Sequence, residues 1–308
     1  MARGFDAELA QIESLRSTSP AETLAPLRKF LANRNAFLVA KAAKLAAAHN
    51  HQALIPDLVA AFNRFLPSPS NPDSKDDQQC WAKEAIAQTL AAFEYQEPEL
   101  FLTGMRCFQP GYTDDTATAL RGICALALVQ CRSLSSQSVL THLLPLFADK
   151  QIPVRVNAAR AVEQIGSDAS ALLLRLRAEL ASDVPELLGA CYSGVLRLEG
   201  PGAIPWAAKF LPQGRDEPDE AAAEAAFAIA ETRTEAAVTL LQSTYKRTRD
   251  PDFRGTLLTA LALTRQDRAI DFLFALIAEG DRIAREALEN SAPSPAVLER
   301  LRNLNPPK

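Results

Sequence analysis

The sequence predicts an all-α protein built from consecutive helical hairpins, and three observations support this fold class. Alanine and leucine, both strong helix formers, provide 55 and 43 of the 308 residues, whereas glycine provides only 12. A polar turn residue followed by a basic helix residue recurs along the chain. The stretches after several of these copies carry apolar residues with the period of an amphipathic helix. We therefore expect about eight hairpins stacked into an α-α solenoid, that is, a superhelix.

The repeating unit places Asn or Asp six residues before Lys or Arg at the start of an alanine-rich helix. Four copies keep this spacing, two later copies shorten it, and two more have lost the basic residue. From the fourth copy onward the copies recur every 31 to 34 residues, which is the length of one helical hairpin. The clear copies are Asn35 with Lys41, Asp77 with Lys83, Asp115 with Arg121 and Asp149 with Arg155; the shortened ones are Asp250 with Arg254 and Asp281 with Arg285; the last two lie near Leu188 and Ala222.

The fourth copy illustrates how one unit is built. In its second helix, Val154, Ala158 and Val162 fall on one stripe, and small alanines let a neighbouring helix approach closely. Asp149 stands in the turn before this helix. We expect its carboxylate to cap the helix and to pair with the basic residue of the same or a neighbouring repeat.

These residues resemble the HEAT repeat. The resemblance rests on Leu144-Pro145-Leu146, on Asp149, and on Val154-Arg155 followed by the alanine ladder. The run from Asp250 to Arg254 is similar to the short HEAT-like repeats first noted in phycobilisome lyases. The resemblance covers residues 20–305 and implies a right-handed solenoid. Most HEAT-like arrays are protein-binding scaffolds, and minorities are bilin lyases, alkylpurine-type DNA glycosylases or enzyme subunits.

The chain divides, on this interpretation, into a capping helix at 1–19, a repeat solenoid at 20–305 and a tail at 306–308. Phe5, Leu9 and Ile12 have helical spacing in the first segment. An insertion rich in proline and serine at 67–77 interrupts the second unit. Long loops in compact arrays are more often unstructured than active, so a binding role for the insertion is the less favoured interpretation.

The sequence argues against a membrane-spanning segment and against a signal peptide. No apolar run reaches the roughly 18 to 20 residues needed to cross a bilayer, and Asp6 and Glu8 stand where a signal peptide would be apolar. We therefore expect a cytoplasmic protein that does not insert into membranes. The five cysteines form no CxxC pair, so we expect reduced, buried thiols rather than a disulfide or zinc framework.

The sequence contains no motif typical of nucleotide binding, serine hydrolysis or zinc proteolysis. His49 and His51 form a histidine cluster, but two ligands are too few for a metal site. Their surroundings favour a helix end and turn. We therefore assign no catalytic, cofactor-binding or metal-binding residue and expect no cofactor. The sequence leaves enzymatic activity open, and a protein without such activity is the favoured interpretation.

Charge argues against nucleic-acid binding. The chain carries 33 basic and 37 acidic residues, a net charge of -4, whereas phosphate-binding domains are usually basic. Residues 28–64 are an exception, with six Lys or Arg against one Asp. A second basic cluster follows the end of a predicted helix, where Tyr245 could add stacking. The possible anion-binding residues are Arg34, Lys41, Lys44, Lys246, Arg247 and Arg249.

Helical geometry predicts which residues face the inside of the solenoid. The side chain five residues after each basic residue points about 140° away from it, opposite the buried stripe. This row has one charged member, which suits a protein segment better than a polyanion. An equally good interpretation is that its small residues only allow tight curvature, or that the register is off by one. The row is Ala46, Gln88, Leu126, Arg160, Ser193, Phe227 and Thr259, and its candidate protein-binding residues are Gln88, Leu126, Arg160 and Phe227.

The sequence therefore favours a non-catalytic protein-binding scaffold or adaptor that uses the concave face of the solenoid. No motif identifies the protein partner, and nucleic acid is a less favoured partner. One alternative is a bilin lyase-type enzyme or lyase subunit, which the repeat similarity alone suggests. The other is a nucleic-acid binder or alkylpurine-type DNA glycosylase that uses the basic N-terminal end.

Overall fold

The computed structural model describes residues 2–66, 76–111, 114–180, 182–212 and 220–304. Apart from turns and an isolated bridge between Pro110 and Asp115, these residues are helical, which confirms the all-α fold class. The chain divides into two compact units, Met1–Ile165 and Gly166–Lys308, and each is described by itself. Of the insertion predicted at 67–77, residues 67–75 lie outside the described residues, as does the tail predicted at 306–308.

The N-terminal unit begins with α1 (Ala2–Ser14), which packs on the second helix of the first hairpin. Four hairpins follow among the described residues of this unit, and each pairs an even-numbered helix with the next odd-numbered one. The first hairpin is α2 (Pro20–Leu31) and α3 (Ala36–Ala48), the second η1 (Gln52–Leu54), α4 (Ile55–Arg64) and α5 (Trp81–Ala92), the third α6 (Pro98–Met105) and α7 (Thr118–Leu128), and the fourth α8 (Ser136–Leu143), η2 (Leu144–Ala148) and α9 (Ile152–Ile165).

The C-terminal unit repeats this arrangement. Its described residues form four more hairpins, followed by the helix α18 (Pro295–Leu304). They are α10 (Asp168–Glu179) with α11 (Pro185–Glu199); η3 (Gly200–Ala203), α12 (Ile204–Ala207) and η4 (Ala208–Phe210) with α13 (Glu220–Glu231); α14 (Glu235–Arg247) with α15 (Pro251–Thr264); and α16 (Asp267–Ala278) with α17 (Arg282–Asn290).

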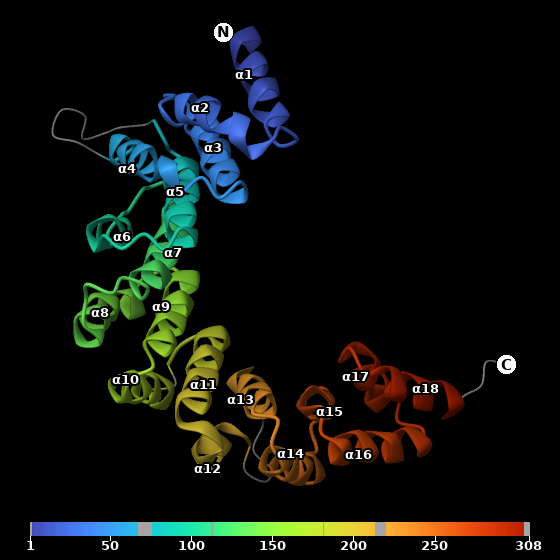
Figure 1. The fold of residues 1–308 in the computed structure, drawn as a ribbon. Helices are drawn as coiled ribbons and strands as arrows, with labels where there is room; N and C mark the ends of the chain where they lie inside the picture. Colours follow the sequence, from blue (N-terminus) through green and yellow to red (C-terminus); the bar gives the residue numbers. More distant parts are fainter. Residues whose placement is uncertain (1, 67–75, 112–113, 181, 213–219, 305–308) are drawn as a thin grey trace. The chain divides into compact units, whose positions relative to one another are not determined.

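Within each unit the hairpins stack so that their second helices form one row. In the N-terminal unit α3 packs on α5, α5 on α7, and α7 on α9. In the C-terminal unit α11 packs on α13, α13 on α15, and α15 on α17. Figure 1 shows these rows within each unit, with the first helices of the hairpins in a second row beside them. This pairwise packing is the arrangement expected for HEAT-like repeats.

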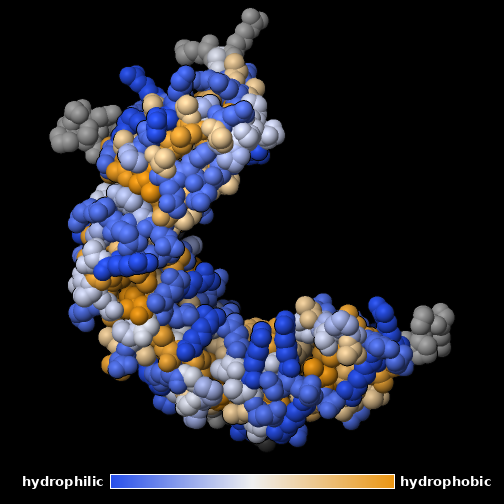
Figure 2. Space-filling model, viewed as in Figure 1, coloured by the Kyte–Doolittle hydropathy of each residue, from blue (hydrophilic) through white to orange (hydrophobic). Residues whose placement is uncertain are grey.

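Small residues allow the close contacts within a row. The carbonyl oxygen of Ala43 on α3 accepts a hydrogen bond of 3.0 Å from the hydroxyl of Thr89 on α5. The stripe predicted on α9 is confirmed, because Val154, Ala158 and Val162 are fully buried. On the face drawn in Figure 2, hydrophilic residues cover most of the described surface, and hydrophobic residues show mainly in smaller patches.

Aspartates predicted to lie in turns begin several of the second helices. The Asp250 carboxylate accepts a hydrogen bond of 2.7 Å from the backbone N–H of Phe253. Asp281 does the same for Ala284 at 3.0 Å, and Asn35 caps α3. Each cap satisfies N–H groups that have no partner within the helix itself.

No described helix has the length and hydropathy to cross a membrane. All five cysteines are free thiols; four are buried, as predicted, whereas Cys107 is half-buried. Burial raises the pKa of the Cys191 thiol to about 12. Such a thiol is protonated at neutral pH and is therefore a poor nucleophile.

Candidate functional site

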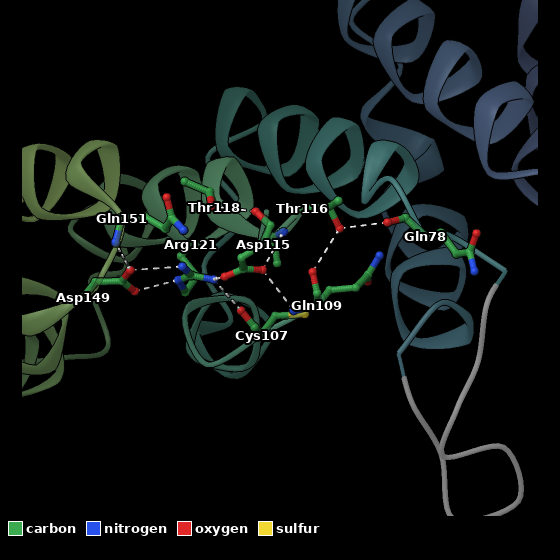
Figure 3. A network of polar contacts seen from close by, with 10 residues as sticks. Gln78, Cys107, Gln109, Asp115, Thr116, Thr118, Arg121, Asp149 and Gln151 are labelled. Carbon is green, nitrogen blue, oxygen red and sulfur yellow. Dashed lines mark hydrogen bonds and ion pairs between the residues drawn. The ribbon is translucent and has the colours of Figure 1, made fainter. Parts of the chain in front are cut away.

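A ladder of buried polar contacts joins the turns of the N-terminal unit. Figure 3 shows Arg121 of α7 between Asp115, which precedes the same helix, and Asp149 of the following repeat. Its Nε and Nη2 atoms donate to the Asp149 carboxylate at 2.8 and 3.1 Å, and Nη1 donates to Asp115. Arg121 also donates to the carbonyl oxygen of Cys107 at 2.9 Å. Asp149 thus pairs with the basic residue of a neighbouring repeat, as predicted.

The ladder continues into the second hairpin. Lys83 forms an ion pair of 3.1 Å with Asp77, and both side chains are at most 2% exposed. The Asp77 carboxylate also accepts hydrogen bonds from the backbone N–H groups of Ala82 and Lys83. Because every partner is a neighbouring turn or helix start, we assign this ladder to stability rather than to ligand binding.

A groove with a volume of about 970 Å³ lies in the N-terminal unit. It is lined by side chains within residues 12–16, at the end of α1 and in the turn after it, within 37–49, on α3 and at its C-cap, within 81–88 of α5 and within 119–123 of α7. We call it the N-terminal groove. Three of these helices are the second helices of consecutive hairpins, so the groove runs along the inner row, and α1 closes one side of it.

One part of the N-terminal groove is aromatic. The rings of Phe37 and Trp81 meet edge to face with centroids 5.6 Å apart, and Phe5 lies 6.2 Å from Phe37. Trp81 is 49% exposed, which is unusual for so large an apolar side chain. Its exposed surface is therefore available to an apolar group of a ligand.

Five charged side chains also line the groove: Glu13, Arg16, Lys41, Lys44 and Glu84. A single carboxylate, that of Glu13, pairs with both Arg16 and Lys41. The hydrogen bond from Lys41 lowers the pKa of Glu13. Across the groove, burial raises the pKa of Glu84, the negative charge of Asp77 adds to this effect, and Lys44 partly opposes it.

Only part of the predicted inner row lines the N-terminal groove. Gln88 is exposed and lines it. Arg160 is exposed on α9, outside the groove lining. Leu126 on α7 and Phe227 on α13 are half-buried rather than exposed. Phe227 lies in the other unit.

The prediction that Ala46 belongs to the inner row is wrong, because Ala46 is fully buried. The error comes from the choice of Lys41 as the first basic residue of the series. When Phe37 of α3 is aligned with Trp81 of α5, whose ring it meets edge to face, the residue that matches Lys83 is the buried Val39. Five residues after Val39 comes Lys44, which is exposed and lines the groove.

The predicted anion-binding residues are divided between the two units. Lys41 and Lys44 line the N-terminal groove, but Arg34 lies in the turn before α3 and is not part of the lining. The second cluster, at the end of α14, consists of exposed side chains: Lys246, Arg247 and Arg249.

Tyr245 adds no stacking surface to that second cluster, contrary to the sequence-based suggestion. It is only 4% exposed, and the guanidinium of Arg254 lies 4.0 Å from the centre of its ring. Its ring face is therefore already occupied.

Several of the basic residues at 28–64 are also engaged. Arg28 pairs with Asp57 at 3.0 Å. Arg64 donates to the carbonyl oxygens of Leu31 and Asn33 at 2.7 and 3.0 Å. These contacts reduce the charge available for a phosphate-binding surface.

The histidine cluster has a structural environment. The hydroxyl of Thr23 lies 3.0 Å from Nδ1 of His49 and 2.8 Å from Nε2 of His51, and it lies 2.8 Å from the carbonyl oxygen of Pro20. A hydroxyl has one hydrogen, so at least one imidazole donates to it. Burial, and then the charge of His49, lower the pKa of His51. Within the described residues, no group of three His, Cys, Asp or Glu side chains is arranged to hold a metal ion.

The sequence analysis missed two exposed apolar features. Trp81 stands two residues before Lys83 and is the first residue of α5, so its place in the repeat pattern could have revealed it. A second feature is an exposed leucine stripe at i, i+4 and i+8 along α10 and its C-cap, where Leu172, Leu176 and Leu180 are 68%, 58% and 57% exposed. The run Leu172-Leu173-Leu174 is visible in the sequence, but its register on the helix is not.

Comparisons with known proteins agree with the repeat architecture. Residues 207–292 match the family model described as HEAT repeats. No curated protein matches the chain. A solved structure of human deoxyhypusine hydroxylase in complex with glycerol aligns over 98% of this chain and 100% of its own, at 16% identity and a TM-score of 0.23. A TM-score this low provides no basis for transferring an activity.

Proposed function

We propose that this HEAT-repeat protein is a non-catalytic protein-binding scaffold and that a peptide segment of its partner lies in the N-terminal groove. The observation that carries this proposal is the groove itself, which combines an exposed aromatic side chain with polar groups that are open to a ligand. Lys44, Glu84 and Gln88 form no side-chain hydrogen bond or ion pair with any described residue. Such groups can bond a ligand without first breaking an internal contact.

The shape of the groove fits a peptide segment. Its volume of about 970 Å³ is at the upper end of the roughly 300 to 1,000 Å³ typical of ligand pockets. Ala48, Ala85 and Ala119 are small residues of its lining, and they leave room for the side chains of a bound segment. Helical arrays commonly bind extended partners along such concave rows.

Neither alternative function gains a specific observation. The bilin lyase alternative still rests on repeat similarity alone. For nucleic acid, half of the six cations at residues 28–64 are already engaged: Arg28, Lys41 and Arg64 each bond a carboxylate or a carbonyl oxygen. Protein binding therefore remains the better supported function.

A groove-filling variant tests the proposal. Ala48 is an exposed lining residue at the end of α3, so Ala48→Trp fills the groove without disturbing the core. Ala25 is an exposed alanine of α2 outside the groove, and Ala25→Trp is the matched control. Peptides selected from a displayed random library on the full-length protein are then titrated against both variants.

The proposal predicts that the selected peptides lose at least about tenfold in affinity for Ala48→Trp and keep their affinity for Ala25→Trp, a difference of about 1.4 kcal/mol. Circular dichroism should give the same helical content for all three proteins. A selection that yields no peptide, or peptides that bind all three proteins equally, overturns the proposal.

A further inference from the structure

The charged side chains that line the N-terminal groove carry a net positive charge: Arg16, Lys41 and Lys44 outnumber the two carboxylates. The side chains of Arg16 and Lys41 are 65% and 24% exposed, and they share the single carboxylate of Glu13, which is 38% exposed. Lys44 is exposed and has no ion pair with any described residue. Glu84, the other carboxylate of the lining, is half-buried. An approaching segment therefore meets an excess of cations.

An aromatic surface lies beside these cations. Phe37 and Lys44 are both on α3, seven residues or about two turns apart, and so lie on the same face of the helix. The ammonium of Lys41 lies 5.2 Å from the centre of the Phe37 ring, which uses one face of that ring. The half-exposed ring of Trp81, packed edge to face against Phe37, is the larger open surface.

We infer, on the basis of the protein-binding function proposed above, that the segment bound in this groove is acidic and carries an aromatic side chain. Its carboxylates face Arg16 and Lys44, and its aromatic ring packs on Trp81. Charge complementarity gives the acidic preference, because a carboxylate balances the surplus cation, whereas a basic side chain adds to it. The aromatic preference follows from the geometry of ring pairs, which favours an edge or an offset face over an exposed indole.

A polyanion such as nucleic acid is a poorer occupant. It needs several cations along its length, whereas this groove has one surplus positive charge, from Arg16, Lys41 and Lys44 against Glu13 and Glu84. A short acidic segment requires only one or two cations. Binding of labelled duplex DNA to the same groove, blocked by Ala48→Trp, is therefore an outcome that would overturn the inference.

The experiment begins with the peptides that depend on the groove, defined as those that lose affinity in Ala48→Trp but not in Ala25→Trp. Their sequences are compared with the unselected library. The inference predicts enrichment of Asp and Glu over Lys and Arg, together with enrichment of Phe, Tyr and Trp. Enrichment of basic residues, or no enrichment of acidic ones, overturns it while leaving the protein-binding proposal intact. If no groove-dependent peptide exists, both proposals fail.

Charge reversal assigns the acidic preference to one residue. Lys44→Glu replaces an attraction by a repulsion, so acidic peptides should bind about tenfold more weakly. Lys29→Glu is the matched control, because Lys29 is exposed on α2 outside the groove lining. A selection repeated on Lys44→Glu should lose the acidic enrichment, and one repeated on Lys29→Glu should keep it. Acidic peptides that bind Lys44→Glu as tightly as the unmodified protein contradict the inference.

Truncation assigns the aromatic preference. Trp81→Ala should weaken peptides that carry an aromatic residue by about fivefold, and peptides whose aromatic residue is replaced by alanine should respond less. Phe108→Ala is the control, since Phe108 is 71% exposed and is not part of the groove lining. Equal losses for both kinds of peptide would show that Trp81 does not recognise the aromatic side chain.

Discussion

The two units build the same hairpins with different polar chemistry in their turns. In the N-terminal unit, Arg121 is 7% exposed and holds the carboxylates of two successive repeats. In the C-terminal unit, Arg254 follows a turn in the corresponding place, but it donates only to the carbonyl oxygens of Tyr245 and Thr248 and forms no ion pair with any described residue. The C-terminal unit does keep one partly buried turn pair, between Arg177 and Asp183. The hairpin at Arg254 nevertheless forms without a cation that joins the carboxylates of two repeats, so the hairpin architecture does not require the arrangement seen at Arg121.

The largest expected effect comes from removing each of these two guanidinium groups in a separate variant. Arg121→Met leaves the carboxylates of Asp115 and Asp149 without their cation in a buried site, so we expect a loss of about 3 kcal/mol in the free energy of unfolding. Arg254→Met removes two hydrogen bonds to carbonyl oxygens and a ring contact, so the loss should be about 1 kcal/mol. Urea unfolding followed by circular dichroism gives both values. Equal losses would contradict the contrast between the units.

A second test uses glycines in the two units. A methyl group on Gly104 of α6 would lie 2.3 Å from Sγ of the buried Cys124, so Gly104→Ala should destabilise by about 1 to 3 kcal/mol. On Gly255 of α15 it would make an ordinary contact of 3.4 Å with Ile283. Gly255→Ala should stabilise by about 0.5 to 1 kcal/mol through higher helix propensity. Thermal unfolding midpoints should move in opposite directions, and a shift of the same sign in both would refute this account of the packing.

The third test uses pH, because all three histidines lie in the N-terminal unit. The pKa of His51 in the folded protein lies below its ordinary value of 6.5. Protonation therefore favours the unfolded state, and stability around α2 and α3 should fall as the pH drops below about 6.5. Amide exchange, corrected for intrinsic rates, should rise there between pH 7.5 and pH 5, and the rise should be smaller in His51→Gln. An unchanged rise in that variant would assign the effect to other groups.

The smallest expected effect concerns exposed ion pairs of the C-terminal unit. Arg197 and Glu231 pair at 3.0 Å, with side chains 58% and 52% exposed. Such pairs contribute about 0 to 1 kcal/mol, so Arg197→Ala should change the unfolding midpoint little. A loss as large as that of Arg121→Met would show that exposure does not separate the two kinds of pair.

Much of the fold is predictable from the sequence because it depends on local patterns. The turn aspartates precede the helices that they cap, and the pairing of Arg121 with Asp149 follows from the repeat spacing. The groove is harder to predict, since its lining depends on long-range contacts. Lys41 fits the repeat spacing, yet its ammonium pairs with Glu13, 28 residues away on α1. Nothing local in the sequence reveals that contact. The choice of Lys41 as the first basic residue of the series placed the predicted inner row on Ala46, which is buried.

The fluorescence of Trp81 tests the central claim, that the N-terminal groove is the protein-binding site. The protein has two tryptophans, and Trp206 lies in the C-terminal unit, so Trp206→Phe leaves Trp81 as the reporter. Titration with a selected acidic peptide that carries Phe should shift the emission to shorter wavelength and saturate at the independently measured Kd. A peptide that binds this variant with unchanged affinity and leaves the emission unaltered would contradict the claim.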